Sequence, residues 1–239
     1  MADLGGIHSD VGRRQLLQTL LSYAVVGVTA QTAIEVASPH TLHAKPIVTP
    51  DAALHALLAG NQRFAENRLT SIAHDLILLK EHTVEKQEPF AAVLACADSR
   101  VPVELIFDQT IGHIFVSRVA GNMVTPEMIA TLEYGVAVLG IKALLVLGHG
   151  NCGAIKSAMK ADTVPGQISV LYQHLQPAIA QSGGNVDKAI ETNARLQAQL
   201  LRTSSTVIRD AVRAGTLKVE AGVYDLATGK VSLREPATS

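Results

Sequence analysis

The sequence contains no tryptophan, and only 3% of its 239 residues are aromatic. Surfaces on which nucleic-acid bases stack are built from aromatic side chains, so such surfaces are not expected here. The formal net charge is −1, with 20 Lys and Arg against 21 Asp and Glu. Because this charge attracts neither nucleic acid nor an anionic membrane surface, we expect neither as a partner.

Cysteine and long apolar runs are also scarce. The two cysteines, Cys96 and Cys152, allow at most one disulfide. The apolar run that ends near residue 30 is too short and too interrupted to predict a stable membrane span. With 48% apolar and 17% charged residues, the chain has the composition of a globular protein with one sizeable core.

Residues 1–44 do not resemble the start of a folded domain. The pair Arg13-Arg14 precedes the apolar run, small residues follow it, and residues 42–44 fit a cleavage site. This layout is typical of a twin-arginine export signal, which predicts an exported protein in a periplasmic or thylakoid-lumen-like compartment. The alternative is an ordinary amphipathic helix that begins with two arginines, in a protein that stays in the cytoplasm.

The remainder, residues 45–239, is predicted to be a single domain. Thr49-Pro50-Asp51 has the residues of a helix start and predicts an N-terminal helical arm. A polar helical stretch is expected at 76–88, and further helices separate the apolar segments. Those segments predict strands at 90–96, 113–119, 143–147 and 217–224, with one short strand after them. Strands alternating with helices predict an α/β fold with a mostly parallel central sheet.

Reactive side chains follow two of the predicted strands. Cys96, Asp98 and Arg100 alternate, so all three would point the same way if the extended conformation continued. His149 and Cys152 lie where a strand gives way to a helix. Because strands of one parallel sheet end at the same edge, these groups can meet there. Two sulfurs and one ring nitrogen suit zinc, with Asp98 or a water as the fourth ligand.

These motifs, Cys96-x-Asp98-Ser99-Arg100 followed by His149-x-x-Cys152-Gly153, resemble those of the β-class carbonic anhydrases. The resemblance extends from about residue 49 to the last strand. It implies that Cys96, His149 and Cys152 bind zinc, and that zinc-bound hydroxide attacks carbon dioxide reversibly to give bicarbonate and a proton. It also implies that Asp98 and Arg100 orient this hydroxide. A homodimer, or a larger oligomer of dimers, is implied as well, with the substrate pocket built across a subunit interface.

Three more positions are similar to the pocket of plant-like members of the family: Gln87, Phe115 and Tyr134. They would form an apolar cleft with one amide donor. Other members close at low pH and hold bicarbonate with a tryptophan, which this sequence lacks. The resemblance therefore implies an open site in which Asp98 pairs with Arg100 and becomes a zinc ligand only in a closed form.

Other interpretations remain open at this point. Gly148-x-Gly150-x-x-Gly153 matches a dinucleotide-binding fingerprint, although residues 163–184 do not resemble the second strand that the fingerprint requires. The two cysteines could form a disulfide, or the zinc could be purely structural. The same hydroxide could also attack carbonyl sulfide or carbon disulfide. Asp108, His113 and Arg118 are assigned to surface or structural roles.

Overall fold

The computed structural model describes residues 47, 49–70 and 84–236. The chain divides into two units, and the second, residues 45–239, carries every described element. The expected export signal at 1–44 lies outside the described residues. Within them, no helix is both long enough and apolar enough to cross a membrane.

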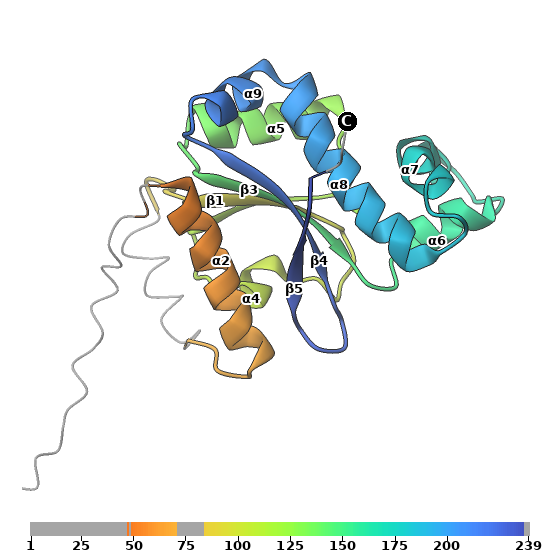
Figure 1. Cartoon of the computed structure of the whole chain (residues 1–239), viewed down its shortest axis with the longest axis horizontal. Helices are drawn as coiled ribbons and strands as arrows, with labels where there is room; N and C mark the ends of the chain where they lie inside the picture. The colour runs from red at the N-terminus through yellow and green to blue at the C-terminus, as the bar shows by residue number, and fades with distance from the viewer. Residues whose placement is uncertain (1–46, 48, 71–83, 237–239) are drawn as a thin grey trace, which may run out of the picture. The chain divides into compact units, whose positions relative to one another are not determined.

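A five-stranded sheet with the order β2-β1-β3-β4-β5 forms the centre of the domain (Figure 1). Four strands run parallel, and only β5 is antiparallel to its neighbour. The mostly parallel sheet predicted from the sequence is therefore confirmed. The strands are β1 (Ala91–Ala95), β2 (Ile114–Arg118), β3 (Ala143–His149), β4 (Lys218–Tyr224) and β5 (Val231–Arg234).

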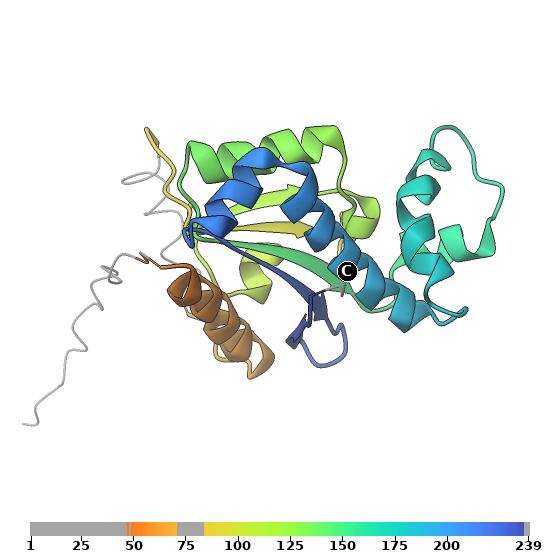
Figure 2. The ribbon, with the colours of Figure 1, turned by 45° about the horizontal axis from the view of Figure 1, so that its top comes forward.

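Helices cover both faces of this sheet, as Figure 2 shows. Successive side chains of a strand point to opposite faces. Ala92 and Leu94 therefore pack under α5, α8 and α9, whereas Val93 packs under α2 and α4. A sheet buried on both faces requires strands that are apolar throughout, and β1 and β3 are buried along their whole length. The helices are α2 (Pro50–Ala65), α4 (Val103–Ile106), α5 (Pro126–Ala137), α8 (Val186–Ser204) and α9 (Thr206–Arg213).

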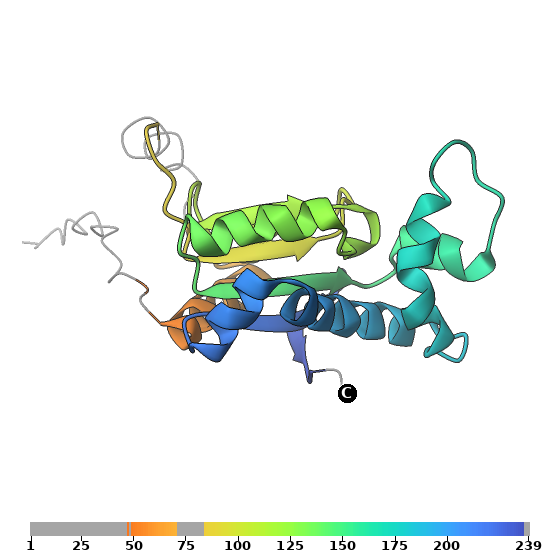
Figure 3. The same cartoon turned by 90° about the horizontal axis from the view of Figure 1, so that it is seen from above.

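The carboxyl ends of the parallel strands meet a separate group of elements. Helices α6 (Gly153–Lys160) and α7 (Val170–Ala180) lie beyond these strand ends in Figure 3. The short 3₁₀ helix η2 (Ala120–Asn122) follows β2 at the same edge. The sulfurs of the two cysteines belong to a buried cluster formed with α6, α7 and α8. The reactive residues therefore lie at the edge where binding sites of parallel sheets usually form.

Helix boundaries confirm the predicted starts and correct one element. Thr49 caps α2 by accepting a hydrogen bond from the N–H of Ala52, and Thr125 caps α5 in the same way. The helix expected at 76–88 is wrong in its described part, because residues 84–88 are irregular. Pro89 explains this, since the residue before a proline is excluded from helical geometry by its ring.

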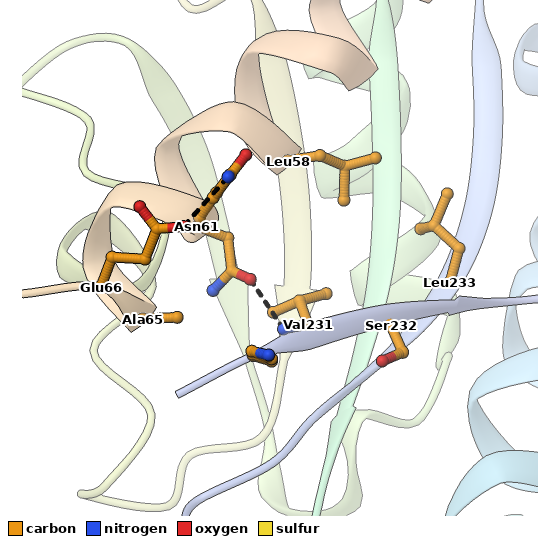
Figure 4. A pocket seen from close by; sticks show the side chains of 9 residues that line it. Leu58, Asn61, Ala65, Glu66, Val231, Ser232 and Leu233 are labelled. Carbon is orange, nitrogen blue, oxygen red and sulfur yellow. Dashed lines mark hydrogen bonds between the residues drawn. The ribbon is translucent and has the colours of Figure 1, made fainter. Parts of the chain in front are cut away.

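Asn61 anchors the helical arm. Its side chain accepts the N–H of Val231 at 2.7 Å and donates to the carbonyls of Gly229 at 2.8 Å and Ile106 at 3.2 Å. Figure 4 shows this residue bridging α2 and β5 beside a cavity of about 340 Å³. All three contacts are with backbone groups, so Asn61 ties α2 to the edge strand and to α4.

Candidate metal centre

Three candidate ligands converge at the carboxyl ends of two neighbouring strands. β1 pairs directly with β3, with Ala95 opposite Leu147, which places Cys96 next to the end of β3. His149 is the last residue of β3, and Cys152 caps the start of α6. The two sulfurs and the histidine nitrogen lie within 4.8 Å of one another. Because zinc bonds to sulfur and nitrogen are about 2.0–2.3 Å long, a single ion among these atoms can contact all three.

His149 shows that this cluster suits a metal. Its side chain is fully buried, and Nδ1 lies 2.9 Å from the carbonyl of Gly150, to which it must donate its proton. Nε2 consequently carries the lone pair. Within the described residues it is buried without a hydrogen-bond partner, and the nearest carboxylate oxygen, Oδ2 of Asp98, lies 3.8 Å away. A buried ring nitrogen in this state is the usual metal ligand of histidine.

The two cysteines are free thiols rather than a disulfide. The contact with Cys152 is the main cause that lowers the pKa of the Cys96 thiol to about 4, and the hydrogen bond from the N–H of Gly121 acts in the same direction. The same contact, together with burial, raises the pKa of Cys152. The pair therefore shares one proton. Zinc binding requires both thiols as thiolates, and two sulfurs with one nitrogen form a typical zinc donor set.

Asp98 and Arg100 form a two-pronged ion pair next to the cluster. Nε and Nη2 of Arg100 lie 2.9 and 2.8 Å from the two carboxylate oxygens of Asp98. This guanidinium holds the pKa of Asp98 well below its usual range. The extended conformation does not continue to Arg100. The chain turns at Asp98 because its side chain accepts the N–H of Arg100 and its carbonyl accepts that of Val101.

Arg118 also contacts this centre, although only a surface or structural role was predicted for it. It ends β2 directly opposite Ala95. Its Nε donates to the carbonyl of Cys96 at 3.0 Å and its Nη2 to that of Asp98 at 2.6 Å. One side chain therefore fixes the backbone of the segment that carries both the candidate ligand Cys96 and the candidate catalytic carboxylate Asp98.

The three predicted pocket residues do not meet this centre within one chain. Phe115 and Tyr134 lie together, with ring centroids 6.3 Å apart. Phe115, however, pairs with Ala92, four residues and thus about 13 Å before Cys96 along the sheet. Gln87 is exposed and precedes the amino end of β1, whereas Cys96 follows its carboxyl end.

Gly148, the first glycine of the fingerprint, has a packing explanation. A dinucleotide-binding unit requires a second strand about twenty residues after the glycines, where this chain instead forms the helix α7. A Cβ on Gly148 would lie 3.3 Å from the side chain of Ile190. Gly148 therefore allows α8 to pack closely on β3.

Comparisons with known proteins agree with the geometry. Residues 91–231 match the family model described as carbonic anhydrase. Carbonic anhydrase 2 of Mycobacterium tuberculosis is 32% identical over 202 residues, which cover 80% of this chain and 95% of that protein. The β-carbonic anhydrase of Coccomyxa in complex with acetazolamide is 28% identical with a TM-score of 0.59, and the match covers 78% of this chain and 88% of that one. The chain belongs to the β-class carbonic anhydrases.

A carbonic anhydrase of Mycolicibacterium smegmatis is similar to the same extent. It is 34% identical over 197 residues, which cover 79% of this chain and 95% of the relative. As a β-class carbonic anhydrase, the chain is an enzyme that uses zinc to hydrate carbon dioxide reversibly, and the predicted family, activity and cofactor are confirmed. The Cys96, His149 and Cys152 cluster is able to bind that metal.

Proposed function

We propose that Cys96, His149 and Cys152 hold the catalytic zinc of this carbonic anhydrase and that Asp98 and Arg100 orient the nucleophile. The observation that carries this assignment is the convergence of two sulfurs on the buried, unpartnered Nε2 of His149. A stopped-flow carbon dioxide hydration assay on protein of measured zinc content tests it. Zinc near one equivalent with rapid hydration is expected. If metal-loaded protein hydrates no carbon dioxide, the zinc at this site has only a structural role.

When bound, zinc supplies hydroxide at neutral pH by lowering the pKa of water from about 15.7 to roughly 7. The protein supplies the orientation. Arg100 keeps Asp98 ionised through two N–H donors, so the carboxylate accepts hydrogen bonds and donates none. Asp98 can thus accept a hydrogen bond from the nucleophile. This contact would orient the nucleophile so that a lone pair of its oxygen points toward the substrate carbon. Arg100 also lies 3.4 Å from the carbonyl of Asn151, so it links the two loops that carry the cluster.

We propose that the site is of the open, plant-like type, in which Asp98 stays on Arg100. The two-pronged ion pair supports this assignment. Because Arg100 lowers the pKa of Asp98, that carboxylate stays ionised from neutral to mildly acidic pH. Its titration therefore adds no inflection to the pH dependence of the hydration rate in this range. Activity should therefore decline gradually below neutrality as the nucleophile is protonated. Hydration rates between about pH 6 and 9 at constant ionic strength check this. An abrupt, cooperative loss that is relieved by removing bicarbonate contradicts it.

We further propose that Gln87, Phe115 and Tyr134 complete the substrate pocket of a second copy of the chain in a homodimer. Their distance from their own metal centre supports this arrangement. Tyr134 on α5 is 47% exposed, and Val138, which caps the end of that helix four residues later, is 63% exposed. Large apolar side chains exposed on one helix commonly mark an interface. The strand β2, which carries Phe115, is an edge strand of the described sheet, and edge strands can pair with another chain.

We also propose that residues 1–44 direct export of the folded, metal-loaded protein. Fusing them to a fluorescent reporter should move most of the reporter across the membrane of a bacterial host that has a twin-arginine pathway. Changing Arg13 and Arg14 to lysine should keep it in the cytoplasm, although the charge is unchanged. The measurement is the reporter fraction in periplasmic extracts. Cytoplasmic retention of the unmodified fusion counts against a signal.

A further inference from the structure

Helix α8 buries two amide side chains on the face that packs on the sheet. Asn193 is 0% exposed and Gln197 is 5% exposed, and they lie one turn apart. Burying an amide costs free energy unless its polar groups are hydrogen-bonded. Apolar residues would serve helix packing better at these positions. The partners of the two amides therefore indicate what they contribute.

Both amides bind the segment that follows β2. Asn193 Nδ2 donates to the carbonyl of Gly121 at 2.9 Å, and Gln197 Oε1 accepts the N–H of Val124 at 2.8 Å. Gln197 Nε2 also donates to Asn193 Oδ1 at 3.2 Å, so each amide fixes the orientation of the other. Residues 121–124 are thus held at both ends by one helix.

The held segment directs one N–H at the metal cluster. Gly121 donates its backbone N–H to Sγ of Cys96 at 3.3 Å. Gly121 has a φ of +78°, a conformation that glycine adopts without strain. A Cβ at this position would come within 3.1 Å of the side chain of Leu175. The positive φ and this tight contact both favour glycine at the position whose N–H reaches the sulfur.

We propose that Asn193, supported by Gln197, is a positioning residue of the zinc centre, which holds the Gly121 peptide so that its N–H donates to the Cys96 thiolate. This inference rests on the proposed role of Cys96 as a zinc ligand. An N–H donor fixes the direction of the sulfur lone pairs and withdraws charge from them. With zinc bound, Cys96 would then give less charge to the ion, which would leave the ion a stronger Lewis acid toward its fourth ligand. Partners of this kind typically change metal affinity or activity by about 10- to 100-fold.

A purely structural role would have a different signature. If Asn193 only docked α8 on the sheet, its loss would lower the melting temperature without changing the electronic state of the sulfur. Sulfur-to-metal charge-transfer absorption of the cobalt(II)-substituted protein reports that state directly. Removing an N–H donor raises the energy of the sulfur electrons, which moves this absorption to longer wavelength.

The experiment compares Asn193→Leu with the matched control Thr192→Val. Thr192 is the preceding residue of the same helix, is 6% exposed and takes no part in the described Asn193 and Gln197 contacts. Zinc release to a chromophoric chelator is expected to be about 10- to 100-fold faster in Asn193→Leu, because a Cys96 sulfur without its N–H donor is less firmly oriented and more readily protonated. The cobalt band should move to longer wavelength, because the sulfur electrons are then higher in energy. Thr192→Val should release zinc at the wild-type rate with an unmoved band.

Two further measurements keep the test decisive. If Asn193→Leu fails to fold, Gln197→Met removes the supporting amide and keeps a side chain of similar length. It should also speed zinc release and move the cobalt band to longer wavelength, with smaller changes than those expected for Asn193→Leu. In the wild-type protein loaded with an NMR-active cadmium isotope, the amide proton of Gly121 should show scalar coupling to the metal. An unmoved cobalt band in a folded variant, or no such coupling, overturns the inference. Wild-type protein that binds no metal refutes the assignment of Cys96 instead.

Discussion

Replacing Cys96 with serine, His149 with alanine or Cys152 with serine is expected to abolish zinc binding and carbon dioxide hydration together. The chain offers three ligand atoms at this centre, so the loss of one leaves too few to hold the ion against water. The effect should exceed the roughly 10- to 100-fold losses that are typical of groups behind the ligands. Metal content after dialysis and stopped-flow hydration on the same sample measure both quantities.

A control variant separates this loss from damage to the core. Ser117 is 5% exposed on β2, and within the described residues its hydroxyl has no hydrogen-bond partner. Ser117→Ala therefore changes a buried residue without breaking a contact, and it should retain zinc and activity. Circular dichroism shows whether each variant is folded. A folded ligand variant that keeps both zinc and turnover removes that residue from the centre.

The sequence was sufficient to predict that the three candidate ligands lie together, because strand ends are easy to locate. β1 and β3 are apolar throughout, and each runs directly into reactive side chains. Neighbouring parallel strands end at one edge, so the pairing of Ala95 with Leu147 brings Cys96 and His149 together without any long-range signal. The alternation of strands and helices fixed the fold class for the same local reason.

The supporting contacts could not be predicted because their partners are backbone groups. Arg118 binds the carbonyl of Cys96 from 22 residues away, and Asn193 binds that of Gly121 from 72 residues away. Every residue has a backbone carbonyl, so the residue type does not show which carbonyl a side chain will bind. Neither pairing therefore produces a sequence motif. The turn at Asp98 could not be predicted for a similar reason, since it depends on a hydrogen bond from a backbone N–H, that of Arg100, to the Asp98 side chain.

Arg100→Ala is expected to keep zinc and to lose about 100- to 1000-fold in turnover, a loss comparable to that of one preorganised electrostatic donor. None of the three ligand atoms is touched. The variant removes both N–H donors from Asp98, whose Oδ2 lies only 3.8 Å from Nε2 of His149. The freed carboxylate can then turn to the fourth ligand position and exclude water. Arg100→Lys should lose less, because it keeps the charge without the two-pronged geometry.

A second arginine of the chain provides the matched control. Arg63 forms an ion pair with Asp108 between α2 and the segment after α4. Arg63→Ala therefore breaks a comparable pair outside the metal centre, and it should retain full turnover per zinc. Turnover of Arg100→Ala that equals that of this control would remove the Asp98 and Arg100 pair from the mechanism.

Azide binding distinguishes a closed site from a merely misoriented one, because small anions bind zinc at the position left open by the protein. If Asp98 takes that position in Arg100→Ala, azide should bind at least about tenfold more weakly than to the wild-type protein. Adding Asp98→Ala should restore azide binding, since the competing carboxylate is gone. It should not restore turnover, because nothing then orients the nucleophile. Wild-type azide affinity in Arg100→Ala would show that the variant stays open, and the role of Arg100 would be limited to orienting Asp98.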